Sequence, residues 1–242
     1  MLQYLEGAGK GMKRSAVTVV IPAYNEEKTI GNIINGTTSI MNELGVAYEI
    51  IVVDDGSSDR TGQIASNHKT IVLSNKKNHG KGYALRRALK HSTGDIIVTI
   101  DSDGEHQPKE IPDLIDPLFN GTDIVAGSRF LNRKKRMTTN LNIIGNFLFN
   151  AAIMTLTGKV VTDSQTGFRA IKRDVLEELN LESNGYEIEA EITVKGLKNG
   201  FTYKEKPITV ERRKYNVSKL RLLTDGTRIL KTILKAKFTK IA

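Results

Sequence analysis

Four short runs of apolar, largely β-branched residues alternate with stretches of helical periodicity, and this alternation constrains the fold more than any other feature of the 242-residue chain. The runs are residues 16–21 (AVTVVI), 48–53 (YEIIVV), 95–100 (DIIVTI) and 123–126 (DIVA). Strands that are apolar on both faces are typical of a parallel sheet covered by helices on both sides. The alternation therefore predicts an α/β fold with a mostly parallel sheet flanked by helices.

The same periodicities predict the remaining elements. They indicate helices over residues 26–43, 61–68, 82–91, 174–179 and 187–198, a short strand over 70–73, and an edge strand or hairpin over 203–210. Residues 138–158 contain no charged side chain but have helical spacing of apolar residues. Two interpretations of this helix stay open, packing on the sheet or facing a membrane.

The positive charge of the chain is concentrated at its C-terminal end. Residues 212–242 hold ten Lys or Arg and one acid, so they account for the whole formal net charge of +9. Apolar residues in this tail fall at helical spacing: Ile229, Leu230, Ile233, Leu234, Phe238 and Ile241. Such a basic amphipathic helix can bind an anionic membrane surface, or it can pack on the catalytic domain or a second subunit. We expect a flexible leader (1–15), one catalytic domain (16–215) and this C-terminal segment (216–242).

Composition excludes several classes of protein. Without Cys, the chain has no disulfide framework, no thiolate zinc site and no cysteine nucleophile. It has no run of 18 consecutive apolar residues and no signal-peptide pattern at its N-terminus, so we expect a cytoplasmic protein without a membrane-spanning helix. A nucleic-acid-binding module is disfavoured, because only 6% of residues are aromatic and no recognition motif occurs.

Polar clusters follow three of the predicted strands at their carboxyl ends. They are residues 22–26 (PAYNE), 54–59 (DDGSSD) and 101–105 (DSDGE). Open parallel sheets bind ligands at this edge. Three carboxylates within five residues repel one another unless a cation lies among them, and oxygen ligands suit Mg²⁺ or Mn²⁺ that hold a substrate diphosphate. A solvated acidic turn is the alternative.

Side-chain types in these clusters suit a nucleotide. The Tyr24 ring can stack on a base, whereas the carboxylates of Glu26, Asp54 and Asp55 can accept hydrogen bonds from base or ribose. Lys81, at the start of a predicted helix, suits a phosphate. A turn at Asp55-Gly56 and a helix cap at Ser58 or Asp59 are compatible with binding.

In this order, the three clusters and the segment 80–82 (GKG) resemble the family 2 inverting glycosyltransferases. Segments 127–129 (GSR), 163–169 (DSQTGFR), 185–189 (GYEIE) and 213–219 are similar to the dolichyl-phosphate mannosyltransferase and glucosyltransferase branch. The resemblance implies a GT-A-like, Rossmann-type fold and a divalent metal at the DxD motif. Two positions depart from the family pattern, because Glu105 stands where many relatives have Gln and Asn216 replaces a usual Gly.

The resemblance also implies roles for individual residues. Nucleotide-sugar binding is expected of Pro22, Ala23, Tyr24, Glu26, Asp54, Asp55, Lys81, Asp101, Ser102 and Asp103. Metal binding is expected of Asp101, Asp103 and Glu105, and catalysis of Asp101, Asp103, Asp163 and Arg129. Contacts to acceptor or phosphate are expected of Arg129, Arg136, Arg213, Ser218 and Lys219. Asp163 would orient the acceptor, or act as a base if the acceptor were a hydroxyl.

The expected activity is inverting transfer of a hexose from a GDP- or UDP-sugar to a polyprenyl (dolichyl) phosphate. Mannose is favoured, and glucose or GlcNAc is possible. A glycan hydroxyl acceptor is the first alternative and a sugar nucleotidyltransferase the second. The expected cofactor is Mg²⁺ or Mn²⁺, and the expected location is the cytoplasmic face of an anionic membrane, with an integral membrane partner or a second copy as possible partners and no nucleic acid.

Overall fold

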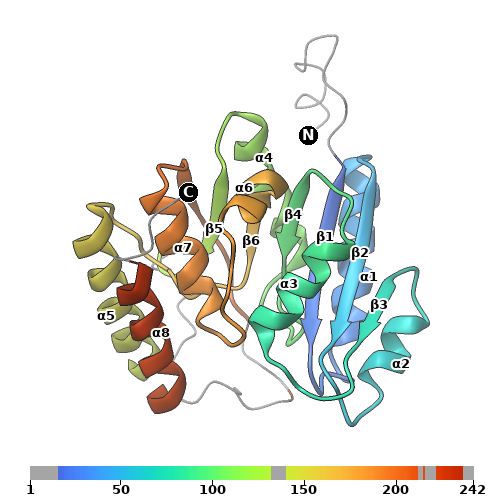
Figure 1. Cartoon of the computed structure of the whole chain (residues 1–242). Coiled ribbons are helices and arrows are strands. Elements are labelled where there is room, and N and C mark those ends of the chain that lie inside the picture. Colours follow the sequence, from blue (N-terminus) through green and yellow to red (C-terminus); the bar gives the residue numbers. More distant parts are fainter. Residues whose placement is uncertain (1–15, 132–139, 212–214, 216–221, 237–242) are drawn as a thin grey trace.

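A computed structural model describes residues 16–131, 140–211, 215 and 222–236 (Figure 1). The strands are β1 (Val17–Ala23), β2 (Tyr48–Asp54), β3 (Ile71–Ser74), β4 (Ile96–Thr99), β5 (Ile124–Ser128), β6 (Arg169–Lys172) and β7 (Tyr203–Pro207). The helices are α1 (Ile30–Leu44), α2 (Thr61–Ser66), α3 (Lys81–His91), α4 (Ile111–Phe119), α5 (Asn140–Thr157), α6 (Arg173–Glu178), α7 (Ile188–Lys198) and α8 (Leu222–Ala236), with a 3₁₀ turn at Pro108–Glu110.

The strands form one seven-stranded sheet in the order β3-β2-β1-β4-β6-β5-β7. The first four are mutually parallel, β5 and β7 are parallel to each other, and β6 runs antiparallel to both β4 and β5. The predicted, mostly parallel α/β sheet is therefore confirmed. Strand β7 lies at the edge, as Pro207 requires, because proline has no N–H for a ladder bond.

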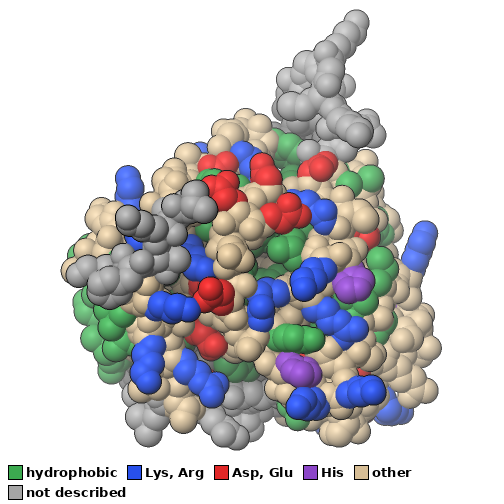
Figure 2. All heavy atoms as spheres, viewed as in Figure 1, with side chains coloured by type: hydrophobic (Ala, Val, Ile, Leu, Met, Phe, Trp, Pro, Cys, Tyr) green, Lys and Arg blue, Asp and Glu red, His purple; other side chains and the backbone are tan. Residues whose placement is uncertain are grey.

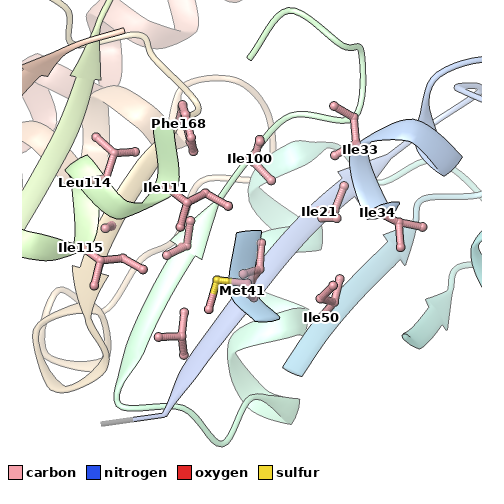
Figure 3. Packing of buried hydrophobic residues seen from close by; sticks show 14 of the residues in the cluster. Ile21, Ile33, Ile34, Met41, Ile50, Ile100, Ile111, Leu114, Ile115 and Phe168 are labelled. Carbon is pink, nitrogen blue, oxygen red and sulfur yellow. The ribbon is translucent and has the colours of Figure 1, made fainter. Parts of the chain in front are cut away.

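Helices cover both faces of the sheet (Figure 1). Alternate residues of β1 point to opposite faces: Val17, Val19 and Ile21 join a core with α1, α2 and α4, and Val20 joins a core with α3, α6 and α7. Figure 3 shows the first core, where Met41 of α1 lies among side chains of the sheet and of α4. Burial on both faces explains why these strands are continuously apolar.

Helices α5 and α8 form a third layer of packing beside α7 (Figure 1). The apolar residues predicted to line one face of the tail are divided: Ile229 and Ile233 are buried against α5 and α7, whereas Leu230 and Leu234 are exposed. Helix α8 begins at Leu222. No helix in the described part of the chain is long and apolar enough to cross a bilayer.

Three elements differ from the sequence prediction. Strand β6 was not predicted: it begins at Arg169, the last residue of the motif 163–169, and this arginine is fully buried. Helix α4 contains two prolines, which usually break helices: Pro112 is in its first turn, where the missing N–H is harmless, and Pro117 is near its end. The predicted helix over residues 26–43 begins only at Ile30, because residues 24–29 form the loop after β1.

Candidate active site

The polar clusters meet at one edge of the sheet. Strands β2, β1 and β4 are adjacent and parallel, so the loops that follow them emerge together. Pro22 and Ala23 end β1, Tyr24 is half-buried and Glu26 is buried. Ser102, after β4, donates a hydrogen bond from Oγ to the Pro22 carbonyl at 2.9 Å. The predicted nucleotide-binding residues of these loops are therefore gathered at the carboxyl ends of the strands, as the sequence indicated.

Side chain–backbone hydrogen bonds join the loops after β1 and β2. The backbone N–H of Asn25 donates to Ser57 Oγ at 2.9 Å, and Asn25 Oδ1 accepts the N–H of Ser58 at 2.8 Å. The N–H of Glu26 donates to Thr61 Oγ1 at 2.8 Å. Asn25 has a φ of +52°, in the left-handed region that Asn tolerates better than most residues. These contacts fix the two loops relative to each other before any ligand binds.

Asp54 and Asp55 organise the same edge through their carboxylates. Asp55 Oδ2 accepts the backbone N–H groups of His79 and Gly80 at 3.0 and 2.7 Å, which fixes the chain just before α3. Asp54 Oδ1 accepts the N–H of Ser57 at 3.0 Å, so it closes the turn after β2. Both aspartates therefore have the local roles that the sequence allowed. Their contact with a nucleotide stays a prediction.

A chain of buried charges connects the DxD loop to α7. Lys81 Nζ lies 2.5 Å from Asp101 Oδ1 and 2.9 Å from Glu189 Oε1, and Glu189 Oε2 lies 3.0 Å from Arg169 Nε. Burial opposes the charge on Lys81, but the attraction of Asp101 and Glu189 outweighs it and raises the lysine pKa above its ordinary value. Lys81 therefore positions Asp101 in this structure, and its predicted contact with a phosphate remains to be tested.

Arg169 is the fully buried end of this chain of charges. Besides its ion pair, Nε donates to the Thr166 carbonyl, Nη2 to the Ser164 carbonyl and Nη1 to Thr193 Oγ1, each at 2.9 Å. Each of its three guanidinium nitrogens thus has a partner, which is the condition for burying a charge. No role was predicted for this residue, because nothing local indicates that its partners Glu189 and Thr193 lie in α7.

Gly167 leaves the space that the Lys81–Asp101 pair occupies. A Cβ at position 167 would overlap Lys81 Nζ and both carboxylate oxygens of Asp101. We expect Gly167→Ala to separate the pair, to lower the free energy of unfolding by about 1–3 kcal/mol as overpacking does, and to reduce turnover.

Urea denaturation and steady-state kinetics check this prediction, with Gly145→Ala in α5 as the matched control. A Cβ at position 145 would meet no atom closer than Phe149 Cε2 at 3.9 Å, so alanine there should leave stability unchanged or raise it. Equal behaviour of the two variants would contradict the packing argument.

Arg129 and Asp163 form a second ion pair next to the acidic loop. Arg129 follows β5, and its Nε and Nη2 donate to Asp163 Oδ2 and Oδ1 at 2.7 and 2.8 Å. Asp163 is fully buried, and its own N–H donates to Glu205 Oε1 at 2.8 Å. Burial opposes the arginine's charge, but the attraction of Asp163 outweighs it and raises the pKa of Arg129. The pair uses two of the three guanidinium nitrogens and fixes the direction of Arg129.

The acidic loop offers carboxylates of the kind that a divalent cation binds. Asp103 and Glu105 are half-exposed beyond β4, and Asp103 Oδ1 accepts the Glu105 N–H at 3.0 Å. Asp101 is turned toward Lys81, and among the described residues no three His, Asp or Glu side chains form a metal cage. Mg²⁺ needs only one or two protein carboxylates when substrate phosphates complete its shell. Asp103 and Glu105 therefore fit such a cation, whereas the expected three-carboxylate set is not assembled.

The chain that follows β7 returns to this loop. His106 and Val210 form an antiparallel bridge, and the N–H of Glu211 donates to the Glu105 carbonyl at 2.9 Å. His106 is buried and its ring stacks on Phe168 at 5.3 Å between centroids, and burial lowers the histidine pKa. Four predicted phosphate-contacting residues lie outside the described residues: Arg136, Arg213, Ser218 and Lys219.

Comparison with known proteins agrees with this geometry. The family model described as Glycosyl transferase family 2 matches residues 18–180. A UDP-N-acetylglucosamine–dolichyl-phosphate N-acetylglucosaminyltransferase from Methanococcus voltae is 32% identical, with 95% of this chain and 99% of that protein covered. The dolichol-phosphate mannosyltransferase of Pyrococcus furiosus is 33% identical over 74% of this chain, which spans only 53% of that longer enzyme.

Solved structures of glycosyltransferases have the same fold as this chain. Glucosyl-3-phosphoglycerate synthase from Mycobacterium tuberculosis, crystallised with Mn²⁺, UDP and phosphoglyceric acid, superposes with a TM-score of 0.72 at 26% identity, covering 93% of this chain and 80% of that one. The same enzyme with Mg²⁺ and UDP gives a TM-score of 0.74 at 26% identity, covering 99% and 84%. The seven-stranded sheet with its acidic loop is thus a GT-A fold, and the chain belongs to glycosyl transferase family 2.

Proposed function

We propose that this chain is an inverting hexosyltransferase that moves a hexose from a nucleotide-diphosphate sugar to a polyprenyl phosphate such as dolichyl phosphate. Mannose is the favoured sugar, followed by glucose or GlcNAc. The relatives from P. furiosus and M. voltae are both named for dolichyl phosphate acceptors, which supports this acceptor class. The proposal includes peripheral attachment to the cytoplasmic face of a membrane.

One observation carries the choice of a phosphate acceptor over a hydroxyl acceptor. A hydroxyl must lose a proton as it attacks, so it needs a carboxylate base that can take up this proton without giving up an ion pair. The two candidates are Asp163, which is bound at both oxygens by Arg129, and Glu189, which is bound by Lys81 and Arg169. A phosphate oxygen is already ionised near neutral pH and needs no base, so paired carboxylates beside an arginine suit it better.

In the proposed reaction, the acceptor phosphate oxygen attacks the anomeric carbon in line with the leaving diphosphate. The new bond joins that oxygen to the anomeric carbon, the bond to the β-phosphate oxygen breaks, and the nucleoside diphosphate leaves with the electron pair. Arg129 holds the acceptor phosphate, and Asp163 keeps the guanidinium aimed at it. Mg²⁺ or Mn²⁺ bound by Asp103 and Glu105 would neutralise charge on the diphosphate.

The test supplies labelled GDP-mannose, UDP-glucose and UDP-GlcNAc separately, each with detergent-dispersed polyprenyl phosphate and with Mn²⁺ or EDTA. We expect one donor to give label that extracts into organic solvent, and we expect EDTA to prevent its appearance. Parallel reactions replace the polyprenyl phosphate with a glycan, and label on the glycan alone would identify the alternative acceptor class. A separate reaction with a nucleoside triphosphate and a sugar 1-phosphate tests the nucleotidyltransferase alternative, which release of pyrophosphate would identify, and either result would overturn the proposal.

A further inference from the structure

Lys81 lies between two carboxylates that differ in their exposure to solvent. Its Nζ is 2.5 Å from Asp101 Oδ1 and 2.9 Å from Glu189 Oε1. Only 4% of the Glu189 side chain is accessible, whereas 25% of the Asp101 side chain is accessible. Glu189 is therefore the buried partner of the lysine, and Asp101 is the partner that can turn toward a ligand.

Two sets of contacts keep Lys81 and Glu189 together. The second carboxylate oxygen of Glu189, Oε2, lies 3.0 Å from Arg169 Nε, so another cation holds the glutamate in place. Helix α3 begins at Lys81 and packs against the loop before α7, because the N–H of Tyr83 donates to the Asn184 carbonyl at 3.0 Å (Figure 1). If Asp101 leaves the lysine, Lys81 therefore stays beside Glu189.

The charges of this cluster balance only while Asp101 belongs to it. Lys81 and Arg169 are positive, and Asp101 and Glu189 are negative. If the Asp101 carboxylate turned to a divalent cation, one positive charge of the cluster would lose its partner. A buried charge without a partner is unfavourable, so an anion has to replace the carboxylate on Lys81.

The surroundings of Lys81 favour the arrival of an anion. Figure 2 shows Lys and Arg side chains over α3, and the cations of this helix include Arg86, Arg87 and Lys90. A surface with one sign of charge attracts ligands of the opposite sign. The loops after β1 and β2, which suit a nucleotide, lie at the same edge of the sheet as Lys81, so the anion with the right chemistry is the diphosphate of a nucleotide sugar.

We propose that Lys81 holds Asp101 away from the cation before the donor binds, and that the donor diphosphate releases this carboxylate by taking its place on the lysine. Lys81 is thus a positioning residue for Asp101. A cation alone has Asp103 and Glu105 as ligands but not Asp101, and a diphosphate alone has to displace Asp101. Each ligand therefore improves the site for the other. This inference rests on the proposed function for the identity of the donor.

The first experiment measures the binding of UDP and of GDP by calorimetry in EDTA, so that no divalent cation takes part. Asp101→Asn keeps the shape of the side chain but weakens its hold on Lys81. We expect this variant to bind one of the two nucleotides about fivefold or more tightly than the wild type does, because the lysine is free for the diphosphate.

The matched control is Asp103→Asn, which removes one charge from the same loop and leaves both ion pairs of Lys81 in place. Its nucleotide affinity in EDTA should change by less than about twofold, because the charge of the half-exposed Asp103 is screened by salt. Equal tightening in the two variants, or no tightening in Asp101→Asn, would overturn the proposal.

The second experiment measures the binding of Mn²⁺ alone, from the electron paramagnetic resonance signal of the free ion. Lys81→Met and Asp101→Asn are made singly and together. With Lys81 present, Asp101→Asn should change the Mn²⁺ affinity by less than about twofold, whereas in the Lys81→Met background it should weaken binding by about tenfold or more. If Lys81 acted on the cation only through space, Asp101→Asn would have the same effect in both backgrounds, and that result would overturn the proposal.

Circular dichroism and urea denaturation check that Lys81→Met folds, which we expect because Glu189 keeps its ion pair with Arg169. If the variant does not fold, Lys81→Gln takes its place in the same set of measurements. The amide of Gln can donate to Glu189 but lacks the charge that holds Asp101.

Neither experiment requires transfer of a sugar, so this inference and the proposed function can fail separately. If labelled donors give product but Asp101→Asn has the same effect on Mn²⁺ binding in both backgrounds, the inference fails and the proposed function stands. If the wild type binds neither UDP nor GDP with Mn²⁺ present, the proposed function fails. The Mn²⁺ measurements then still decide whether Lys81 withholds Asp101 from a cation.

Discussion

Asp103→Asn is expected to lower kcat/KM by at least about 10²-fold, the size of effect seen when one group that stabilises transition-state charge is removed. The substitution keeps the shape of the side chain and its position after β4 but removes the negative charge that would hold a cation. Because Asp103 Oδ1 accepts the Glu105 N–H at 3.0 Å, the amide can keep the loop bond through its own oxygen. Stability should therefore change little.

Steady-state transfer and Mn²⁺-dependent binding of the nucleoside diphosphate, measured by calorimetry, check this prediction. The variant should bind nucleotide with the same affinity with or without Mn²⁺, whereas the wild type should bind more tightly with it. Glu43→Gln, at the exposed end of α1, is the control for loss of one acid. Wild-type activity in the Asp103 variant would refute the assignment of this residue to the cation.

Arg169→Leu is expected to have the largest effect on stability. The change leaves Glu189 with one cationic partner instead of two, and it leaves two carbonyls and the Thr193 hydroxyl without their donor. Removing one member of a buried, hydrogen-bonded ion pair costs about 3–5 kcal/mol, a large fraction of the total stability of a domain. Equilibrium urea denaturation measures the loss directly.

The control replaces an arginine whose ion pair is exposed. Arg60 pairs with Glu27 at 3.3 Å while 74% of its side chain is accessible, so Arg60→Leu should cost less than about 1 kcal/mol. Similar losses in the two variants would mean that the buried network contributes no more than a surface pair. A Lys at position 169 should recover part of the stability, because it keeps the charge but loses the forked geometry.

The sequence predicted the sheet well where each strand is buried on both faces and followed by a polar loop. Strands β1, β2, β4 and β5 satisfy both conditions, and all four were expected within one or two residues of their ends. Strand β6 is also buried on both faces, but its four residues begin with Arg169 and end with Lys172, so they do not form an apolar run. Its identity as a strand depends on pairing with β4 and β5, which are distant in sequence.

The sequence indicated which residues belong to the candidate site, but it did not indicate which of their side chains form ion pairs with each other. Lys81 was expected to contact a phosphate, and no local pattern indicates that Glu189, more than 100 residues later, lies 2.9 Å from it. Gly167 was identified only as part of a motif. A glycine is needed there because Lys81 and Asp101 occupy the space beside it, and this is visible only in the structure. Long-range ion pairs of this kind are set by topology, which local periodicity does not encode.

The position of β5 in the sheet affects how the chain can fold while it is being synthesised. Strands β2, β3 and β4 can each pair with a strand already synthesised, since their neighbours β1 and β2 precede them. Strand β5 lies between β6 and β7, and both follow it in the chain. In a nascent polypeptide, β5 therefore has two unpaired edges until β6 has left the ribosome, and one unpaired edge until β7 has followed. Unpaired edges of this kind promote aggregation, so we expect the second half of this molecule to be more prone to aggregation during translation than the first.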